Sequence, residues 1–367
     1  MRILHVVQHF WPCSGGVEVY LYELCRELIR RGHTSDVACF DTCVYDVRKL
    51  PRRELVEGIN IYRFPYINLK YYKMSFAVLK LLKVYDVIHI HTLGFFSDLL
   101  VLTKPLHGKP LVLSTHGAMF HTSKFSLPKS VYFYGWDRLV LKGIDRTIAV
   151  SRNDQEMFSK ITRNMDFIPI ALHIRQYSGL KREPRRHTFL HIGRLARNKG
   201  IGNLLKTMAS LKAHMPDFRL YVVGDDWMGI RKGFERMARE LGIGANVIFC
   251  GRVSEKEKLS LLAKAQFFVS SSEYEGFGIS VVEAMAAGMP VIANNIEAFR
   301  NFITHGKNGF LVDFSKPEET ASFMRGIAGK DLSRISAAAK SMAGEYDWGE
   351  VIKRVEAVYE ASAGGKA

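Results

Sequence analysis

Two glutamates eight positions apart carry the strongest chemical signal in the chain. Glu275 precedes a glycine-rich stretch, Gly276-Phe277-Gly278, and Glu283 falls in the alanine-rich run that follows. The run Gln266–Ser270 ahead of them is aromatic and β-branched and predicts a strand, so the order is strand, loop, helix. Backbone N–H groups at such a helix start stabilise an anion such as a diphosphate. Carboxylates suit hydroxyl groups instead, so the segment indicates a nucleotide-diphosphate-sugar site.

We assign Glu275 to sugar hydroxyls and Glu283 to a ribose, and we place Phe277, Gly278 and Ile279 beside the donor. The alternative is a solvated glutamate pair near a tight turn. That alternative is the usual outcome for a bare pair at this spacing. The flanking glycines and the apolar helix favour the binding site here.

A second phosphate signal is the loop Gly193–Gly200, between a predicted strand and the helix that opens at Ile201. Arg194 and Lys199 flank this loop, and arginine and lysine are the usual phosphate partners among side chains. Fixed cations stabilise a departing diphosphate more in the transition state than in the ground state. The alternative for both residues is ordinary surface charge.

These motifs together resemble the signature of retaining glycosyltransferases of the large GT4 family, whose architecture is GT-B. The resemblance covers nearly the whole chain and implies that Arg194 and Lys199 bind the diphosphate. It also implies that Gly15 and Gly16 close over the diphosphate, where a plain turn is the alternative. His116 matches the family's His-Gly motif and is expected to contact a sugar hydroxyl. Ser151 matches a family position near the site, with a helix N-cap as the alternative.

Three stretches resemble α-mannosyltransferases that use GDP-mannose to extend a lipid-diphosphate-linked oligosaccharide in exopolysaccharide assembly. They are Thr115–Thr122, Ala149–Asp154 and Gly193–Gly200. The expected partners are therefore a nucleotide-sugar donor and a polyprenyl-diphosphate-linked or other glycan acceptor. Two other classes stay open: a sugar-nucleotide epimerase or hydrolase of the same fold, and a non-catalytic protein that binds anionic polymers.

The origin of both glutamates in one loop and helix bears on the mechanism. Double displacement needs carboxylates on opposite sides of the reacting bond, which this placement does not favour. We therefore expect a front-face route in which the leaving diphosphate helps to deprotonate the acceptor. The sequence has no Asp-x-Asp motif and no His/Cys cluster with metal-ligand spacing, so we expect neither metal nor cofactor.

Charge is distributed unevenly along the 367 residues, whose net charge is +16. Residues 1–186 carry 28 Lys and Arg against 16 Asp and Glu, whereas residues 187–367 carry 24 against 20. A basic half seeks an anionic partner, and no nucleic-acid motif is present. We therefore expect a cytoplasmic protein, peripheral on the inner face of the cell membrane. A basic amphipathic helix over Lys70–Val84 is expected to contact that surface, or else to pack on the sheet with its lysines in water.

Strands alternate with helices, which predicts an α/β fold of two Rossmann-like domains facing a cleft. We expect an N-terminal acceptor-side domain over 1–171, a linker over 172–186, a nucleotide-sugar domain over 187–346, and a C-terminal helix over 347–367 that returns to the first domain. The five cysteines are expected to be free thiols in a reducing compartment. The main helices are predicted at Val17–Arg31, Ile201–Ala213, Ile230–Leu241, Glu255–Lys264, Gly278–Ala287, Pro317–Ile327 and Asp347–Ala361.

Overall fold

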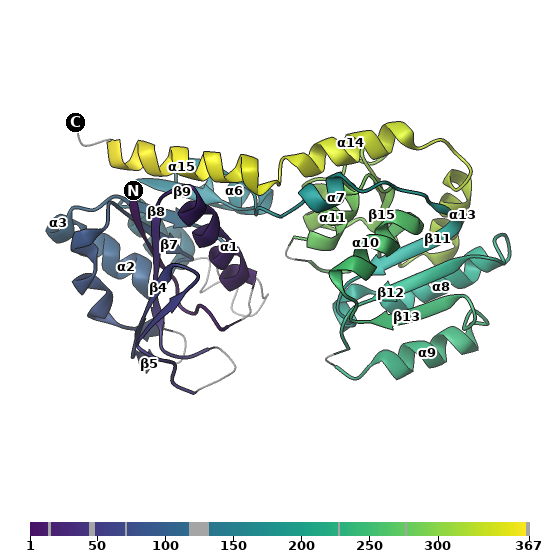
Figure 1. The fold of residues 1–367 in the computed structure, drawn as a ribbon, viewed down its shortest axis with the longest axis horizontal. Coiled ribbons are helices and arrows are strands. Elements are labelled where there is room, and N and C mark those ends of the chain that lie inside the picture. Colours follow the sequence, from purple (N-terminus) through teal and green to yellow (C-terminus); the bar gives the residue numbers. More distant parts are fainter. Residues whose placement is uncertain are drawn as a thin grey trace. The chain divides into compact units, whose positions relative to one another are not determined.

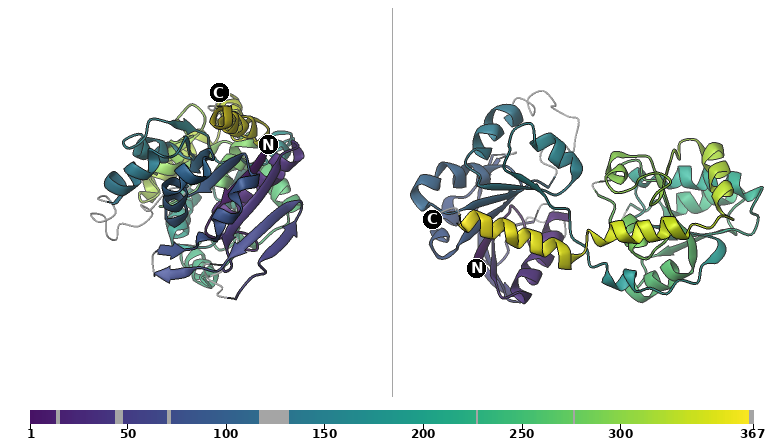
Figure 2. Two further views of the ribbon diagram at one scale, coloured as in Figure 1. Left: turned by 90° about the vertical axis from the view of Figure 1, so that its left-hand side faces the viewer. Right: turned by 90° about the horizontal axis from the view of Figure 1, so that it is seen from above.

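A computed structural model describes the protein over residues 1–13, 16–43, 48–69, 72–116, 132–226, 228–275 and 277–364. The chain forms two compact units: Met1–Ala171 together with Trp348–Ala367, and Leu172–Asp347. Each unit is a largely parallel sheet with helices on both faces, as Figure 1 and the two views of Figure 2 show. The predicted pair of Rossmann-like domains is therefore confirmed.

The first unit has an eight-stranded sheet in the order β10-β9-β8-β7-β1-β2-β4-β3, parallel except for the β3–β4 pair. Successive side chains of a strand point to opposite faces, and in β1 Ile3 joins one hydrophobic cluster while Leu4 joins the other. The strands, with a separate hairpin of β5 and β6, are β1 Arg2–Val6, β2 Thr34–Phe40, β3 Arg53–Val56, β4 Ile59–Phe64, β5 Ile67–Leu69, β6 Tyr72–Met74, β7 Val87–His91, β8 Leu111–Ser114, β9 Arg146–Ala149 and β10 Met165–Phe167.

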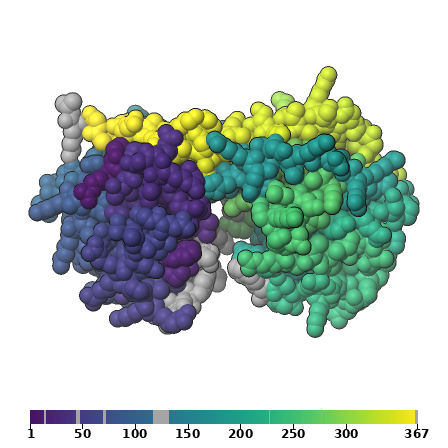
Figure 3. Space-filling view, viewed as in Figure 1, coloured from purple at the N-terminus to yellow at the C-terminus, as the bar shows by residue number. Residues whose placement is uncertain are grey.

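One face of this sheet is covered by α1 and by the C-terminal helix α15. Helix α1 buries Leu21, Leu24 and Leu28 at helical spacing and stops before Gly32, whose φ is +87°. Helix α15 packs its buried face into the same core, and its atoms lie directly on the first unit (Figure 3), so the predicted return is confirmed. The helical segments are α1 Gly16–Arg30, η1 Phe76–Lys80, η2 Leu82–Val84, α2 Phe95–Leu102, α3 Lys104–His107, η3 Phe133–Asp137, α5 Arg138–Leu141, α6 Arg152–Phe158 and α15 Trp348–Gly364.

The second unit has a fully parallel six-stranded sheet in the order β13-β12-β11-β14-β15-β16. Its central strands carry nearly continuous apolar runs, as expected for strands buried on both faces. The strands are β11 Arg185–Ile192, β12 Arg219–Val223, β13 Val247–Gly251, β14 Ala265–Ser270, β15 Val291–Asn294 and β16 Phe310–Val312.

Helices cover both faces of the second sheet, and two separate hydrophobic clusters lie beneath them. Among the described residues, no helix is both long enough and apolar enough to cross a bilayer. The helical segments are α7 Arg175–Ser178, η4 Arg197–Lys199, α8 Ile201–Lys212, α9 Arg231–Glu240, α10 Glu255–Lys264, α11 Ile279–Ala286, α12 Glu297–Arg300, α13 Pro317–Ile327 and α14 Ser333–Gly344.

The prediction of a basic amphipathic helix over Lys70–Val84 is wrong. Lys70 lies outside the described residues. Tyr72–Met74 is a strand that pairs antiparallel with Ile67–Leu69, and two short 3₁₀ turns follow. The periodicity of the lysines was misleading because strand pairing takes up the first part of the segment.

The segment 172–186, expected to be a linker, packs within the second unit. It contains α7 and the start of β11. The Arg182 guanidinium donates to the backbone carbonyls of Leu262, Ala265, Gln266 and Gly288 at 2.5–3.4 Å. The polar composition of the segment therefore reflects structural hydrogen bonding.

The expectation that all five cysteines are free is wrong for one pair. Cys13 and Cys43 form a disulfide with their Cα atoms 5.6 Å apart. Cys25 and Cys39 are free and buried, and Cys250 is free and partly exposed. A separation of 30 residues without a recognisable spacing motif gave no sequence signal for this bridge.

Candidate active site

The two glutamates lie on the loop and helix that follow β14, as predicted. Gly278 is the N-cap of α11, with φ +104°, and a Cβ there would lie 2.6 Å from the Phe299 ring. Only glycine therefore suits this position. The first turn of α11 directs its amides at the loop, which makes this helix start suited to an anion. Gly276 lies outside the described residues.

Lys199 and Glu275 are brought together from the two predicted phosphate motifs. The Lys199 ammonium lies 2.5 Å from Glu275 Oε1, and the two side chains are 15 % and 16 % exposed. Ser272 Oγ donates to the same carboxylate oxygen at 2.8 Å. A charged pair this poorly solvated is electrostatically strong, and it places a cation and an acceptor group at one point beside α11.

Backbone contacts fix the Lys199 loop against the glutamate loop. Gly200 has φ +63°, and a Cβ on it would lie 2.1 Å from the carbonyl oxygen of Ser271. Ser271 Oγ donates to the Lys199 carbonyl at 2.8 Å, and the Glu273 amide donates to the Asn198 carbonyl at 2.8 Å. The close approach requires glycine at position 200, and it sets the position of the Lys199 side chain.

Arg194 lies at the start of the same loop and is exposed. The amides on either side of it, from Gly193 and Leu195, donate to the carbonyls of Val223 and Asp225 at 2.9 and 2.8 Å. The backbone at Arg194 is therefore anchored to the carboxyl end of β12.

His191, on β11 beneath this loop, was missed by the sequence analysis. Its Nδ1 lies 3.0 Å from the Val269 carbonyl oxygen, so Nδ1 carries the proton and Nε2 is an acceptor. Nε2 is buried and has no hydrogen-bond partner in the part of the chain that the structure describes. Burial, with a smaller contribution from the Lys199 charge, lowers the pKa of His191 to about 4.

Glu283 sits in a separate network that the sequence analysis also missed. Its Oε1 accepts from the Tyr177 hydroxyl at 2.9 Å and from the Lys258 ammonium at 3.2 Å. Tyr177 and Lys258 also contact Glu255, at 2.8 and 3.1 Å. Burial and the neighbouring carboxylates raise the pKa of Tyr177, so it stays a hydrogen-bond donor. Tyr177 belongs to the segment expected to be a linker.

Phe277 and Ile279, both predicted to bind the donor, have different surroundings in the structure. The Phe277 side chain packs on Phe302 and Tyr346, with ring centroids 5.6 and 5.3 Å apart. Ile279 is the first residue of α11 and is exposed. The Phe277 ring is therefore partly engaged in the core of the second unit.

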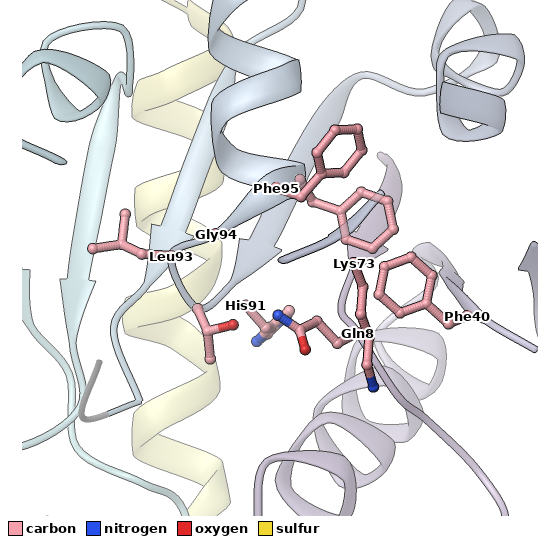
Figure 4. Close-up of a pocket in the computed structure, with 9 residues that line it drawn as sticks. Gln8, Phe40, Lys73, His91, Leu93, Gly94 and Phe95 are labelled. Carbon is pink, nitrogen blue, oxygen red and sulfur yellow. The ribbon is translucent and has the colours of Figure 1, made fainter. Parts of the chain in front are cut away.

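In the first unit, His116 follows β8 and adopts a φ of +42°. Its Nε2 lies 3.1 Å from His91 Nδ1, and His91 Nε2 lies 3.1 Å from His5 Nδ1. Tyr20 meets the His116 ring edge-on at 5.5 Å and stacks on Trp348 of α15 at 5.6 Å. Burial lowers the pKa of His116 to about 4. Figure 4 shows His91 in the wall of a small pocket near the same strand ends.

Ser151 serves as the N-cap of α6, because its Oγ accepts from the Asp154 amide at 3.0 Å. The capping alternative for this residue is therefore confirmed. Gly16 begins α1, and a Cβ there would meet nothing within 4 Å, so close packing does not require this glycine. Gly15 lies outside the described residues.

His5, His89 and His91 have the spacing of a metal site, since one ring nitrogen of each lies within 4.8 Å of the others. Each of their six ring nitrogens already has a hydrogen-bond partner, and the partners of His89 are Tyr359 and Ser114. A metal ion would have to break several of these bonds. The donor set therefore fits a hydrogen-bonded network better than a metal ion, and metal independence stays a prediction.

The two sheets and the Lys199–Glu275 centre define a class: a two-domain α/β enzyme with a site suited to a nucleoside diphosphate. Residues 14–169 match the family described as Glycosyltransferase Family 4, and residues 177–328 match the Glycosyl transferases group 1. The chain belongs to this glycosyltransferase family, and the resemblance predicted from its motifs is confirmed.

Two relatives are similar along nearly their whole length. The GDP-mannose:cellobiosyl-diphosphopolyprenol alpha-mannosyltransferase of Xanthomonas campestris is 31 % identical, with 99 % of this chain and 98 % of the relative covered. The phosphatidyl-myo-inositol mannosyltransferase of Mycolicibacterium smegmatis is 30 % identical, with 99 % and 95 % covered. These identities extend the family assignment over both units.

Solved structures support the fold. A glycosyltransferase from Rickettsia africae superimposes with a TM-score of 0.77 at 19 % identity, covering 100 % of this chain and 99 % of that one. Anabaena HepE in complex with UDP has a TM-score of 0.74 at 22 % identity, covering 98 % and 100 %. The GT-B architecture is therefore confirmed.

Proposed function

We propose that this glycosyltransferase moves mannose from GDP-mannose, with retention of configuration, to a polyprenyl-diphosphate-linked glycan in polysaccharide biosynthesis. The full-length similarity to the Xanthomonas enzyme, whose name gives this donor and a cellobiosyl-diphosphopolyprenol acceptor, supports the proposal. The observation that carries it is the Lys199–Glu275 pair at the start of α11.

In this proposal Lys199 and Arg194 neutralise the diphosphate as it departs. The Lys199 ammonium is already held in place by Glu275, so little reorganisation is needed when negative charge develops. Preorganised charges of this kind contribute a large share of the rate enhancement of enzymes. Glu275, with one oxygen occupied by Lys199 and Ser272, offers its other oxygen to a sugar hydroxyl.

Glu283 is proposed to bind the ribose hydroxyls of the nucleotide. Its contacts with Tyr177 and Lys258 involve Oε1, which leaves Oε2 for a ligand. The two glutamates thus belong to separate networks of one loop and helix. This arrangement supports a front-face route, in which the leaving diphosphate accepts the proton of the attacking acceptor hydroxyl.

The small pocket of the first unit is proposed as part of the acceptor site. Figure 4 shows the rings of Phe40 and Phe95 with the Lys73 side chain between the strand ends. The Lys73 ammonium is 2.9 Å from His9 Nε2 and 5.2 Å from the centre of the Tyr66 ring. The partly exposed Lys73 cation would suit an anionic group of the acceptor, such as a phosphate.

We also propose that the first unit contacts an anionic membrane, where a polyprenyl-linked acceptor would lie. Ile67, Leu69 and Phe76 are exposed apolar residues in and after the β5–β6 hairpin, and Lys80 and Lys83 are exposed close by in the chain. Flotation with vesicles tests this surface. Binding should require anionic lipid and should fall when Ile67 and Leu69 are both replaced by serine, whereas binding to neutral vesicles alone would contradict the proposal.

The donor is tested by thermal shift with GDP-, UDP- and ADP-sugars, followed by product analysis. A ligand at about 100 times its Kd stabilises the folded protein by about 2.7 kcal/mol, and we expect this only with guanine nucleotides. Consumption of GDP-mannose without any acceptor would instead favour an epimerase or hydrolase. Binding of anionic polymers with no response to sugar nucleotides would favour the non-catalytic class.

A further inference from the structure

A stripe of polar residues runs across the face of the first sheet that α1 and α15 cover. His5 on β1, Ser35 on β2 and His91 on β7 are fully or almost fully buried there, among the apolar residues of the same cluster. Buried polar groups require hydrogen-bond partners, and these residues supply one another. Ser35 Oγ lies 3.0 Å from His5 Nε2, and the chain continues through His91 to His116.

The ring protons of the hydrogen-bonded residues Ser35, His5, His91 and His116 are not independent of one another. Burial lowers the pKa of His5 to about 3 and that of His91 well below its usual value, so both rings are neutral at pH 7. A neutral imidazole has one donor nitrogen and one acceptor nitrogen. Once one bond has a direction, every other bond must follow it. All three histidines therefore carry the proton on Nδ1, or all three carry it on Nε2.

The end of the chain at Ser35 favours one of these two states. The Cys25 thiol, on α1, is buried in the same cluster and interacts electrostatically with Ser35, and burial raises the pKa of the thiol to about 12. A hydroxyl is a better donor than a thiol, and an imidazole nitrogen is a better acceptor than sulfur. Between the His5 nitrogen and the Cys25 sulfur, the Ser35 hydroxyl should therefore donate to His5 Nε2, from which it lies 3.0 Å away.

We propose that Ser35, His5 and His91 are positioning residues that fix the tautomer of His116. The direction set at Ser35 passes along the chain and places a proton on His116 Nδ1, the nitrogen not used by His91. His116 then presents a hydrogen-bond donor to its ligand. In terms of the proposed function, that ligand is an oxygen of the sugar substrate, and this part of the inference rests on the proposed function.

The tautomer can be measured without any substrate. Ring ¹⁵N chemical shifts distinguish a protonated nitrogen from an unprotonated one, and a His116→Gln variant assigns the His116 signals by difference. We expect the Nδ1–H form for His116 in the wild-type chain. In Ser35→Ala the bias should be lost and the Nε2–H form should become populated, two rings away from the substitution. Ser35→Thr keeps a hydroxyl and should retain the wild-type tautomer.

Ser114→Ala is the matched control. It removes the same kind of serine–histidine hydrogen bond, but from His89. The ring nitrogens of His89 are hydrogen-bonded to Ser114 and Tyr359, and not to His5, His91 or His116. The His116 signals should not move in this variant. A wild-type His116 that carries its proton on Nε2, or His116 signals that are identical in the wild type and Ser35→Ala, would overturn the proposal.

Kinetics with the preferred sugar nucleotide provide the second readout. Ser35→Ala should lower kcat/KM by roughly three- to tenfold, which corresponds to one misdirected hydrogen bond, and Ser35→Thr should restore it. If no sugar nucleotide is a donor, the proposed function and the kinetic measurement both fail, while the tautomer measurement still stands. If the His116 tautomer shifts in Ser35→Ala but kcat/KM is unchanged, the His116 tautomer does not matter for substrate binding or turnover. That result would overturn the positioning role proposed for Ser35, His5 and His91.

Discussion

The Lys199 ammonium and the Glu275 carboxylate meet at 2.5 Å although 76 positions separate them in the chain. Each comes from a loop at the carboxyl end of its strand, β11 or β14, and these strands are neighbours in the sheet. The carboxyl ends of adjacent parallel strands are where ligands bind in open α/β sheets. The pair therefore marks the position at which the two predicted phosphate motifs act together.

Loss of Lys199 should abolish transfer while the fold survives. Lys199→Ala removes the cation beside the departing diphosphate, and we expect kcat to fall at least about 100-fold, as for other groups that stabilise transition-state charge. Glu275→Ala should have a comparable effect. The control is Lys206→Ala, an exposed lysine on α8, which should keep wild-type activity. Near-normal turnover in both site variants would remove the site assignment.

Tyr177 should affect donor affinity. Tyr177→Phe deletes the hydroxyl that holds Glu283, and we expect the KM for the sugar nucleotide to rise about three- to tenfold with little change in kcat. Gln176→Ala is the matched control, because the Gln176 side chain donates to Glu255 Oε1 at 3.1 Å and this bond does not involve Glu283. Equal effects of the two substitutions would show that Glu255, rather than Glu283, is the residue that matters.

Gly200 should be much harder to replace than Gly242, although both have a positive φ. Gly200→Ala adds a clash with the Ser271 carbonyl to the backbone strain of its positive φ, whereas Gly242, with φ +72°, has open space around its Cβ position. Strain alone costs about 1–2 kcal/mol. We therefore expect Gly200→Ala to lower the urea midpoint clearly more than Gly242→Ala. Similar midpoints for the two variants would contradict the close approach of the loops.

The buried histidines should make the fold sensitive to acid. The pKa values of His5, His116 and His191 are lowered to about 3, 4 and 4, while the unfolded chain titrates near 6.5. Between these values the unfolded state binds more protons, so stability is complete above about pH 6.5 and falls as the pH drops toward 4. His191→Leu should weaken this dependence in urea unfolding, and the exposed His305→Gln should leave it unchanged. A urea midpoint independent of pH over this range would contradict neutral buried histidines.

Local patterns in the sequence predicted the elements that position the site. The strand and helix around Glu275 and Glu283 follow from short-range periodicity and from Gly278, and so does the loop that carries Lys199. The contacts of Glu283 could not be predicted, because Tyr177 and Lys258 come from other elements, and the polar composition around Tyr177 indicated a linker. The lysine spacing of 70–84 predicted a helix. The prediction was wrong because such spacing contains no information about strand pairing with Ile67–Leu69.

The row of hydrogen-bonded buried histidines shows a different limit of prediction from sequence. His5, His89 and His91 are visible in the sequence as polar residues in apolar strands, which is a sign of a buried network. Their partners depend on strand order, since β1 lies between β7 and β2. Periodicity gives the face of each strand but not its neighbour, so Ser35 could not be placed beside His5 from sequence alone.

Calorimetric titration with GDP tests the central assignment most directly, because it needs neither acceptor nor turnover. Wild-type protein and Lys206→Ala should bind GDP with the same Kd. Lys199→Ala should bind at least about tenfold more weakly, a loss of about 1.4 kcal/mol. Equal GDP affinity in all three proteins, or no GDP binding by the wild type, would contradict a nucleoside-diphosphate site at Lys199 and Glu275.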